Sequence, residues 1–197
     1  GAALYVSEAL GAKLARLRAR GPGALQVITD FDHTLTTPSS DECHDVMAGA
    51  PLLPAAYREG MGHMLDFSDG SQRWTMAGPS HDDWWNHCNT MILEAGMRRN
   101  YLVPTVESSC LGLRDGCAAF LGALRTAGVP VCVVSAGFSD VIETYLASVG
   151  VELDLDGTCT GTEQVDGAKQ TPPPLFRVSA NRMVFDDAAD GKLTGFA

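Results

Sequence analysis

Two aspartates, Asp30 and Asp32, follow a short apolar run in the segment LQVITDFDHTLTT at residues 25–37. In an extended chain, residues two apart point to the same side, so we expect both carboxylates to face one space while Phe31 turns into the packing. Two carboxylates in one space repel each other unless a cation joins them. Mg²⁺ typically takes one or two carboxylates together with a substrate phosphate. The pattern therefore predicts a site for magnesium and phosphate at the end of this strand.

A second group of small residues follows another apolar run: Ser135, Ala136 and Gly137. We expect them to form a tight turn after a strand at 129–134, leading into a helix capped by Ser139 or Asp140. Free amides at a helix start bind anions, and ligands of open α/β sheets gather at the carboxyl ends of strands. Alone, an Asp-x-Asp pair or a Ser-Ala-Gly turn more often has a capping or turning role. Their joint occurrence, with Thr34 completing Asp-x-Asp-x-Thr, favours a phosphate site.

Helices and strands alternate around both groups. Residues 6–19 place leucines at helical spacing with basic residues opposite, which predicts an amphipathic helix packed on the rest of the fold. Residues 25–30 predict a short buried strand, because the apolar run is bounded by Gly and Pro. The stretch 113–152 has the pattern helix, strand, loop, helix, and Asp190-Gly191 near the end predicts a hairpin turn. The fold class predicted from this order is α/β.

Residues 38–110 have a different texture, with more Pro, Gly, Met, His and Trp and no alternation of period two. Residues 45–65 and 80–96 look helical, the second with Ser80 as N-cap and Gly96 near its C-terminus. The segment between these helices is the least regular of the chain and is expected to be a loop. The whole region predicts an inserted helical module.

Length and composition limit the kind of protein. The chain has 197 residues, 45% of them hydrophobic, which suits one globular unit with an insertion. The formal net charge of −10 argues against a nucleic acid or an anionic membrane as partner and favours a small molecule. Six cysteines occur singly, without Cys-x-x-Cys pairs, and no run approaches a membrane span. We therefore expect a cytoplasmic protein, and a monomer. The chain opens on Gly1 rather than Met, so its start is expected to be processed, engineered or incomplete.

Several segments together resemble a known family: LQVITDFDHTLT, CHDV, DDWWNHCNTMILEAG and VSAGFSDVIE. The first and last are similar to the first two motifs of the haloacid dehalogenase superfamily. More narrowly, the chain from about residue 6 to its end resembles the type III cytosolic 5'-nucleotidases, also called pyrimidine 5'-nucleotidases. The resemblance implies a Rossmann-like core made of residues 1–37 and 111–197, incomplete at its C-terminal side, with residues 38–110 as a helical cap.

The resemblance also implies Mg²⁺-dependent hydrolysis of nucleoside 5'-monophosphates. Asp30 would attack phosphorus to form an aspartyl-phosphate, and Asp32 would protonate the departing oxygen and later activate water. The Asp30 carboxylate and the Asp32 main-chain carbonyl would hold the metal. The remaining residues implied on the phosphate side are Thr34, Ser135, Ala136 and Gly137.

The sequence departs from this family at two places. The acidic cap residue that meets the base has no clear counterpart; Asp66 is the candidate, and Cys88 stands where the family has a serine near the substrate. The third and fourth motifs, a lysine and an acidic pair, are absent, because neither Lys169 nor Lys192 has the right context. We therefore expect a fragment or truncated gene product, with an exposed sheet edge beside the first-motif strand.

Other interpretations stay open at this point. One is another phosphatase of the same superfamily, such as a phosphoserine phosphatase-like enzyme; a different one is a non-catalytic phosphate-binding module. A zinc site is disfavoured because the adjacent pairs Cys43-His44 and His87-Cys88 lack the usual spacing. His33 is expected at the rim of the site rather than as a base. Trp84 and Trp85 are expected in the cap core, although one of them could stack on a base.

Overall fold

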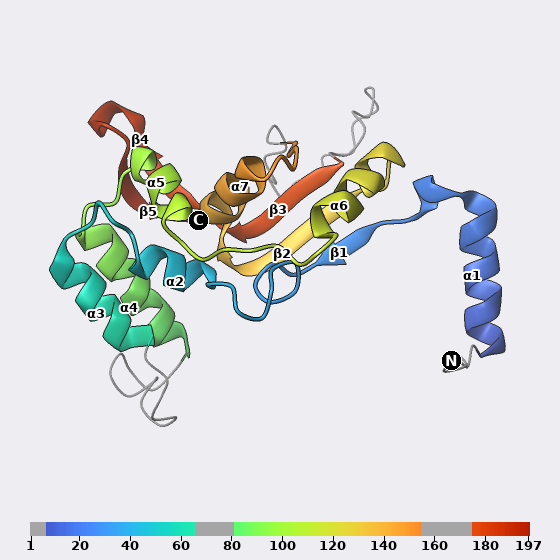
Figure 1. Ribbon diagram of the computed structural model, residues 1–197, viewed down its shortest axis with the longest axis horizontal. Coiled ribbons are helices and arrows are strands. Elements are labelled where there is room, and N and C mark those ends of the chain that lie inside the picture. Colours follow the sequence, from blue (N-terminus) through green and yellow to red (C-terminus); the bar gives the residue numbers. More distant parts are fainter. Residues whose placement is uncertain (1–6, 66–80, 155–174) are drawn as a thin grey trace.

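The computed structural model describes residues 7–65, 81–154 and 175–197 (Figure 1). The α-helices are α1 (Glu8–Arg20), α2 (Cys43–Ala48), α3 (Ala55–Leu65), α4 (His81–Glu94), α5 (Leu102–Glu107), α6 (Cys117–Thr126) and α7 (Ser139–Ser148). The strands are β1 (Val27–Thr29), β2 (Val131–Phe138), β3 (Phe176–Asn181), β4 (Met183–Asp186) and β5 (Lys192–Phe196). Short 3-10 turns lie at Pro22–Ala24, Arg99–Tyr101 and Asp187–Ala189.

A parallel sheet in the order β1-β2-β3 forms the core. Its register pairs Val27 with Val131 and Val133 with Val178, so all three strands run in one direction and end at the same edge. Helix α7 packs on β2 and β3, and its apolar face, which includes the fully buried Ile142, joins Phe31 in one core. Helices on a parallel sheet confirm the predicted α/β class.

Helices α2, α3 and α4, which lie in the region predicted as an insertion, form a second group at the carboxyl end of the sheet (Figure 1). Helices α2, α3 and α4 pack in sequence, and Tyr57 Oη donates to Met47 O at 3.0 Å. Helix α4 is followed by Gly96 at φ 77°, a conformation that favours glycine, as predicted for the end of this helix. The predicted hairpin is confirmed as β4 and β5, which are antiparallel around Asp190 and Gly191. Strand β5 contacts α4, so the hairpin touches the helical group.

The N-terminal helix differs from expectation in its packing. Ser7 caps α1 by accepting the Leu10 N–H at 3.3 Å, and the helix, Glu8–Arg20, lies close to the predicted range 6–19. None of its residues is buried, and Leu10 and Leu14 are 44% and 37% exposed. Figure 1 shows α1 apart from the sheet, on the side away from α2–α4. The prediction that this helix packs on the fold is wrong for the described residues, because none of them covers its apolar face.

Strand β1 is also less buried than predicted. It lies at the edge of the described sheet, beside β2, as expected from the missing motifs. Its central residue Ile28 is 68% exposed, since in the described part of the chain its face of the sheet is uncovered there.

In the described residues, no helix is long and apolar enough to cross a membrane.

Candidate active site

Asp30 and Asp32 lie directly beyond the carboxyl end of β1. Asp30 is exposed, and its Oδ1 accepts the Phe31 N–H at 2.7 Å. Phe31 is fully buried and meets Tyr145 edge-on, with ring centroids 6.1 Å apart. Asp32 is half-buried. The alternation predicted from the sequence, with Phe31 in the packing between two acids outside it, is therefore present.

The Asp32 carboxylate lies in a poorly solvated position. Burial raises the pKa of Asp32 to about 6, and the charges of Glu42 and Asp30 act in the same direction. The Cys43 thiol, 3.7 Å from Asp32 Oδ1, donates to the carboxylate and partly opposes that rise. A carboxyl group with a pKa in this range can both give and take a proton near neutral pH.

A tight turn carries the chain away from Asp32. The Phe31 carbonyl accepts the N–H groups of Thr34, Leu35 and Thr36 at 3.0–3.2 Å. His33 has a φ of 54°, in the left-handed region, and its N–H donates to Thr36 Oγ1 at 2.8 Å. Thr34, predicted on the phosphate side, is exposed on this turn. The turn therefore fixes where Asp32 and Thr34 stand relative to β1.

His33 is predicted at the rim of the site rather than as a base. The His33 ring is exposed, with Nδ1 3.2 Å from Thr37 O and Nε2 3.0 Å from Glu42 Oε1. The Thr37 carbonyl and then Glu42 raise the pKa of His33. The ring contacts Glu42, the N-cap residue of α2, rather than the two aspartates.

The Ser135-Ala136-Gly137 segment is not the turn that the sequence predicted. Strand β2 continues through it to Phe138. Between the pairs Val134↔Ser179 and Phe138↔Asn181, β2 advances four residues while β3 advances two, so the segment forms a bulge. Bulges are frequent next to active sites because they redirect groups at the end of a strand. Strand β2 resumes its pairing with β3 at Phe138.

Inside the bulge, Ser135 Oγ accepts the Gly137 N–H at 2.9 Å. Ser135 is half-buried, Ala136 is exposed and Gly137 is buried. The hydroxyl and the amide expected to bind phosphate therefore face each other at the carboxyl end of β2.

The predicted caps of the following helix are wrong. Phe138 holds the N-cap position of α7, and no side chain caps this end of the helix. The Ser139 hydroxyl instead donates to the Ala180 carbonyl at 3.0 Å, and Asp140 Oδ2 accepts the Met183 N–H at 2.8 Å. Both polar side chains thus form hydrogen bonds with the backbone at and just beyond the end of β3. These partners are distant in the sequence, so the local pattern does not reveal them.

Cys43, the first residue of α2, joins the two halves of the site. Its side chain is fully buried between Asp32 and the bulge. A methyl group built at Gly137 would lie 2.8 Å from Cys43 Cβ and closer still to the sulfur. Burial and then the charge of Asp32 raise the pKa of Cys43 well above its usual value, so the thiol stays protonated. From the sequence, Cys43 is singled out only as a member of a disfavoured zinc pair.

Asn181 is a second residue at this site that the sequence does not predict. Its Nδ2 donates to the Ala136 carbonyl at 2.8 Å and to the Gly137 carbonyl at 3.2 Å. An asparagine at the end of a strand carries no local signal for this role, because the contact depends on the pairing of β3 with β2.

The zinc interpretation is not supported. Within residues 7–65, 81–154 and 175–197, no group of three or more His, Cys, Asp or Glu side chains could hold a metal ion. Cys88 is fully buried in α4, and burial raises its pKa to about 11. Asp66 and Lys169 lie outside the described residues, and Lys192 is exposed on β5.

Aromatic rings cluster where α2 and α4 meet the end of β2. The His44 ring centroid lies 4.5 Å from that of Trp85, 5.2 Å from Trp84 and 4.8 Å from Phe138. Trp84 is buried and donates from Nε1 to Met64 O at 3.2 Å, which fits the predicted place in the cap core. Trp85 is half-buried, next to Phe138 and hence next to the bulge.

The chain is similar to several known nucleotidases. The sequence profile of the family described as pyrimidine 5'-nucleotidase (UMPH-1) matches residues 78–154. The 7-methylguanosine phosphate-specific 5'-nucleotidase A of Xenopus laevis is 26% identical over 199 residues, covering 96% of this chain and 61% of that protein. The 7-methylguanosine phosphate-specific 5'-nucleotidase of Homo sapiens is 24% identical over 159 residues, covering 74% and 51%. The chain thus spans about three fifths of the length of the first of these relatives.

Solved structures show the same fold. Cytosolic 5'-nucleotidase IIIB bound to cytidine matches with a TM-score of 0.53 and 18% identity, covering 91% of this chain and 55% of that chain. A haloacid dehalogenase family hydrolase from Salmonella enterica serovar Typhi matches with a TM-score of 0.50 and 14% identity, covering 98% and 55%. These findings confirm homology to the cytosolic 5'-nucleotidases and the haloacid dehalogenase-type fold.

Proposed function

We propose that this homologue of the cytosolic 5'-nucleotidases is a Mg²⁺-dependent phosphoric monoester hydrolase that converts nucleoside 5'-monophosphates to nucleoside and phosphate. The observation that carries the proposal is the meeting of two strand ends. Asp30 and Asp32 follow β1, the Ser135–Gly137 bulge ends the neighbouring β2, and Cys43 contacts both Asp32 and the bulge.

The donor set at β1 fits Mg²⁺. The Asp30 carboxylate is exposed, and the Asp32 carbonyl follows it by two residues, so both can offer hard oxygen ligands to one ion. Two protein oxygens leave the other positions for water and a phosphate oxygen. When bound, the ion would lower the repulsion between Asp30 and the incoming phosphate.

Asp30 is the proposed nucleophile. Its carboxylate oxygen bonds to phosphorus while the bond from phosphorus to the nucleoside O5' breaks, which leaves an aspartyl-phosphate. Asp32 donates its proton to the departing O5'. In the second step Asp32 takes a proton from water, whose oxygen bonds to phosphorus, and the bond from phosphorus to Asp30 breaks. A pKa of about 6 for Asp32 suits both proton transfers.

We assign phosphate binding to the bulge of β2 and to the turn that follows β1. The Gly137 N–H donates to Ser135 Oγ at 2.9 Å, which leaves the hydroxyl hydrogen to donate to an anion. The Gly137 N–H would itself donate to the anion once this hydrogen bond opens. The Ala136 amide and Thr34 complete the proposed set. Asn181 holds the Ala136 and Gly137 carbonyls, which orients the amides of the segment.

The base is assigned to the aromatic cluster of the cap. Trp85 is half-buried and adjoins Phe138 at the end of β2, so a base stacked on its indole would leave the phosphate near the bulge. Two relatives are named for 7-methylguanosine phosphate, whose base is cationic, and indole faces attract cations. Cys88 is buried, so its thiol contacts a base only if α4 shifts. Asp66 remains the proposed acidic contact.

We further propose a cytoplasmic monomer whose ligand is a nucleotide rather than a nucleic acid or a membrane. The net charge of −10 supports this assignment. The cysteines of the described residues form no disulfide, which suits a reducing compartment.

The test is phosphate release from a panel of monophosphates with and without Mg²⁺. The panel holds uridine, cytidine, adenosine and 7-methylguanosine 5'-monophosphates and phosphoserine, and Asp30→Asn is the matched variant. Mg²⁺-dependent release from the nucleotides, lost in Asp30→Asn by about 10²-fold or more, supports the proposal. Preference for phosphoserine would support a different phosphatase of the same fold. Mg²⁺-dependent binding of beryllofluoride without any release would show a phosphate-binding module instead.

A further inference from the structure

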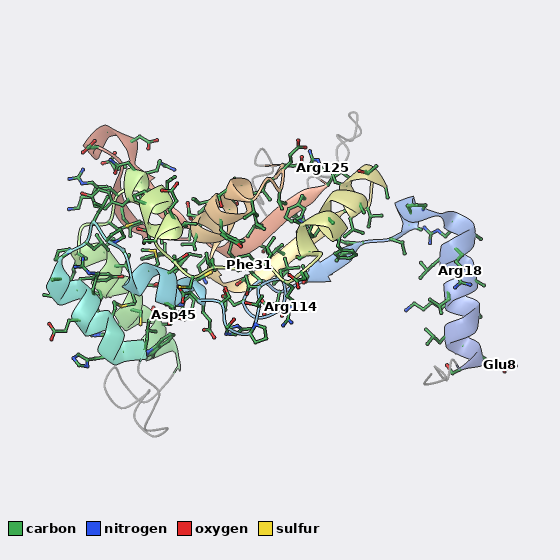
Figure 2. The ribbon with its side chains drawn as sticks, viewed as in Figure 1. Glu8, Arg18, Phe31, Asp45, Arg114 and Arg125 are labelled. Atoms are coloured by element: carbon green, nitrogen blue, oxygen red, sulfur yellow. The ribbon has the colours of Figure 1, made fainter. Side chains whose placement is uncertain are left out.

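Arg114 holds the turn that carries Asp32, although it lies 80 residues from that turn in the sequence. Three successive carbonyls accept hydrogen bonds from this one residue. Its Nη2 donates to His33 O at 2.6 Å, its Nε to Thr34 O at 2.9 Å and its backbone N–H to Leu35 O at 2.9 Å. Figure 2 shows Arg114 beside the start of α6, close to Phe31.

The turn needs such an external partner. His33 adopts φ 54°, which is unfavourable for a residue with a Cβ and persists only where the surroundings enforce it. The hydrogen bonds inside the turn converge on Phe31 O and Thr36 Oγ1, so they leave the carbonyls of residues 33–35 to other donors. The guanidinium supplies a charge-assisted donor to two of these carbonyls.

Arg114 also ties the turn to the segment that leads from the cap back to the core. Thr36 forms an antiparallel bridge with Leu113, and the Thr37 N–H donates to Gly112 O at 2.9 Å. The Leu113 N–H in turn donates to the Tyr145 hydroxyl at 2.9 Å, which anchors this segment on α7. The position of the turn is therefore set from the sheet side and from α7 together, through residues 112–114.

We propose that Arg114 is a positioning residue for Asp32: its guanidinium holds the carbonyls of His33 and Thr34, and so keeps the Asp32 carboxylate in the orientation needed for proton transfer. The catalytic part of this inference rests on the proposed function. The structural part, that Arg114 stabilises the turn, does not.

The first test is hydrogen exchange in the full chain, measured on the amides of residues 33–36. The variants are Arg114→Met, which removes the charged donor, and Arg114→Lys, which keeps the charge. Arg125→Met is the control, since Arg125 lies on α6 and pairs with Glu152 and Asp154 away from the turn (Figure 2). We expect exchange in Arg114→Met to rise about tenfold or more, as for loss of a charged hydrogen bond. Arg114→Lys should fall between this variant and the wild type, and Arg125→Met should match the wild type.

Unchanged exchange in Arg114→Met overturns the proposal. If Arg114→Met does not fold, as judged by near-ultraviolet circular dichroism, Arg114→Lys decides. Faster exchange at residues 33–36 than in the wild type supports the proposal that Arg114 holds the turn, and exchange equal to that of the wild type refutes it. An equal rise in Arg125→Met refutes a local role.

The second test separates positioning from stability through phosphate release. In Arg114→Met we expect kcat to fall about tenfold or more and KM for the nucleotide to change less than kcat, because the base contact and all the proposed phosphate contacts except Thr34 lie outside the turn. Arg114→Lys should recover part of kcat. Faster exchange with an unchanged kcat would refute the positioning role. If the wild-type chain releases no phosphate, the proposed function fails, whereas the exchange experiment still decides whether Arg114 holds the turn.

Discussion

Replacing Gly137 by alanine tests how closely helix α2 is fitted to the bulge of β2. Gly137 is buried, and its φ is not in the left-handed region, so alanine meets no backbone penalty there. The added Cβ would lie 2.8 Å from Cys43 Cβ, closer still to its sulfur, and 3.2 Å from Ser135 Oγ. The effect of the substitution should therefore come from packing against Cys43.

The structure allows the size of this effect to be worked out. Overpacking a tight interior typically costs about 1–3 kcal/mol, because side chains or backbone must shift. For a chain of this length, that corresponds to a fall in Tm of about 2–12 °C. Cys43→Ala removes the sulfur and should cost about 0.5–1.5 kcal/mol alone, as for loss of one methyl-sized group. In the double variant the sulfur no longer opposes the new methyl group. The loss of unfolding free energy in the double variant should therefore be smaller than the sum of the losses in the two single variants, by about 0.5 kcal/mol or more.

The assay is urea unfolding of the wild type, the two single variants and the double variant, with Gly122→Ala as control. Gly122 lies inside α6, and a Cβ there meets nothing within 4 Å. That control should gain about 0.5–1 kcal/mol from helix propensity, the opposite sign. Additive costs for Gly137→Ala and Cys43→Ala, or a Gly137→Ala variant as stable as the wild type, would refute the close fit between α2 and β2.

Three further outcomes are expected. Burial raises the pKa of Asp32 to about 6, so the native state binds this proton more tightly than the unfolded chain; the free energy of unfolding should fall as pH rises from about 4 to about 6. Urea midpoints in EDTA should show this fall in the wild type more than in Asp32→Asn, and parallel curves would contradict it. Ile28→Lys on the exposed edge strand should raise the protein concentration at which light scattering detects association, and an unchanged threshold would exclude this edge as the cause. Trp85→Ala should weaken binding of 7-methylguanosine 5'-monophosphate by about tenfold in fluorescence titrations, since a cation stacked on indole contributes about 1–2 kcal/mol; equal affinity would remove Trp85 from the base site.

Much of the fold follows from local patterns. The apolar run before Asp30, the helix before Gly96 and the turn at Asp190 each depend on residues within a few positions, and each lies where the sequence predicts. The period of two also places Phe31 in the core and the two acids outside it. Homology to the nucleotidases was predictable for the same reason, because the motifs are continuous segments.

The predictions that failed concern partners far apart in the sequence. The bulge at residues 135–137 lies where the register of β2 with β3 shifts, and Ile28 is exposed because no described element covers its face of the sheet. The open face of α1 likewise depends on what lies beside it and not on its own leucines. Whether an apolar side chain is buried depends on which elements pack against it in the folded protein. The amphipathic spacing of a helix shows only which of its faces is apolar.

The sequence by itself determined which residues could do chemistry: two acids after one strand, and a hydroxyl with small residues after another. The tertiary structure alone decided how they are held. Cys43 reaches Asp32 and the bulge from the cap, Asn181 holds the bulge from β3, and Arg114 holds the turn from the returning segment. The physical reason is that hydrogen bonds and steric contacts act over a few ångströms in space, and residues distant along the chain come within that range only when the chain folds.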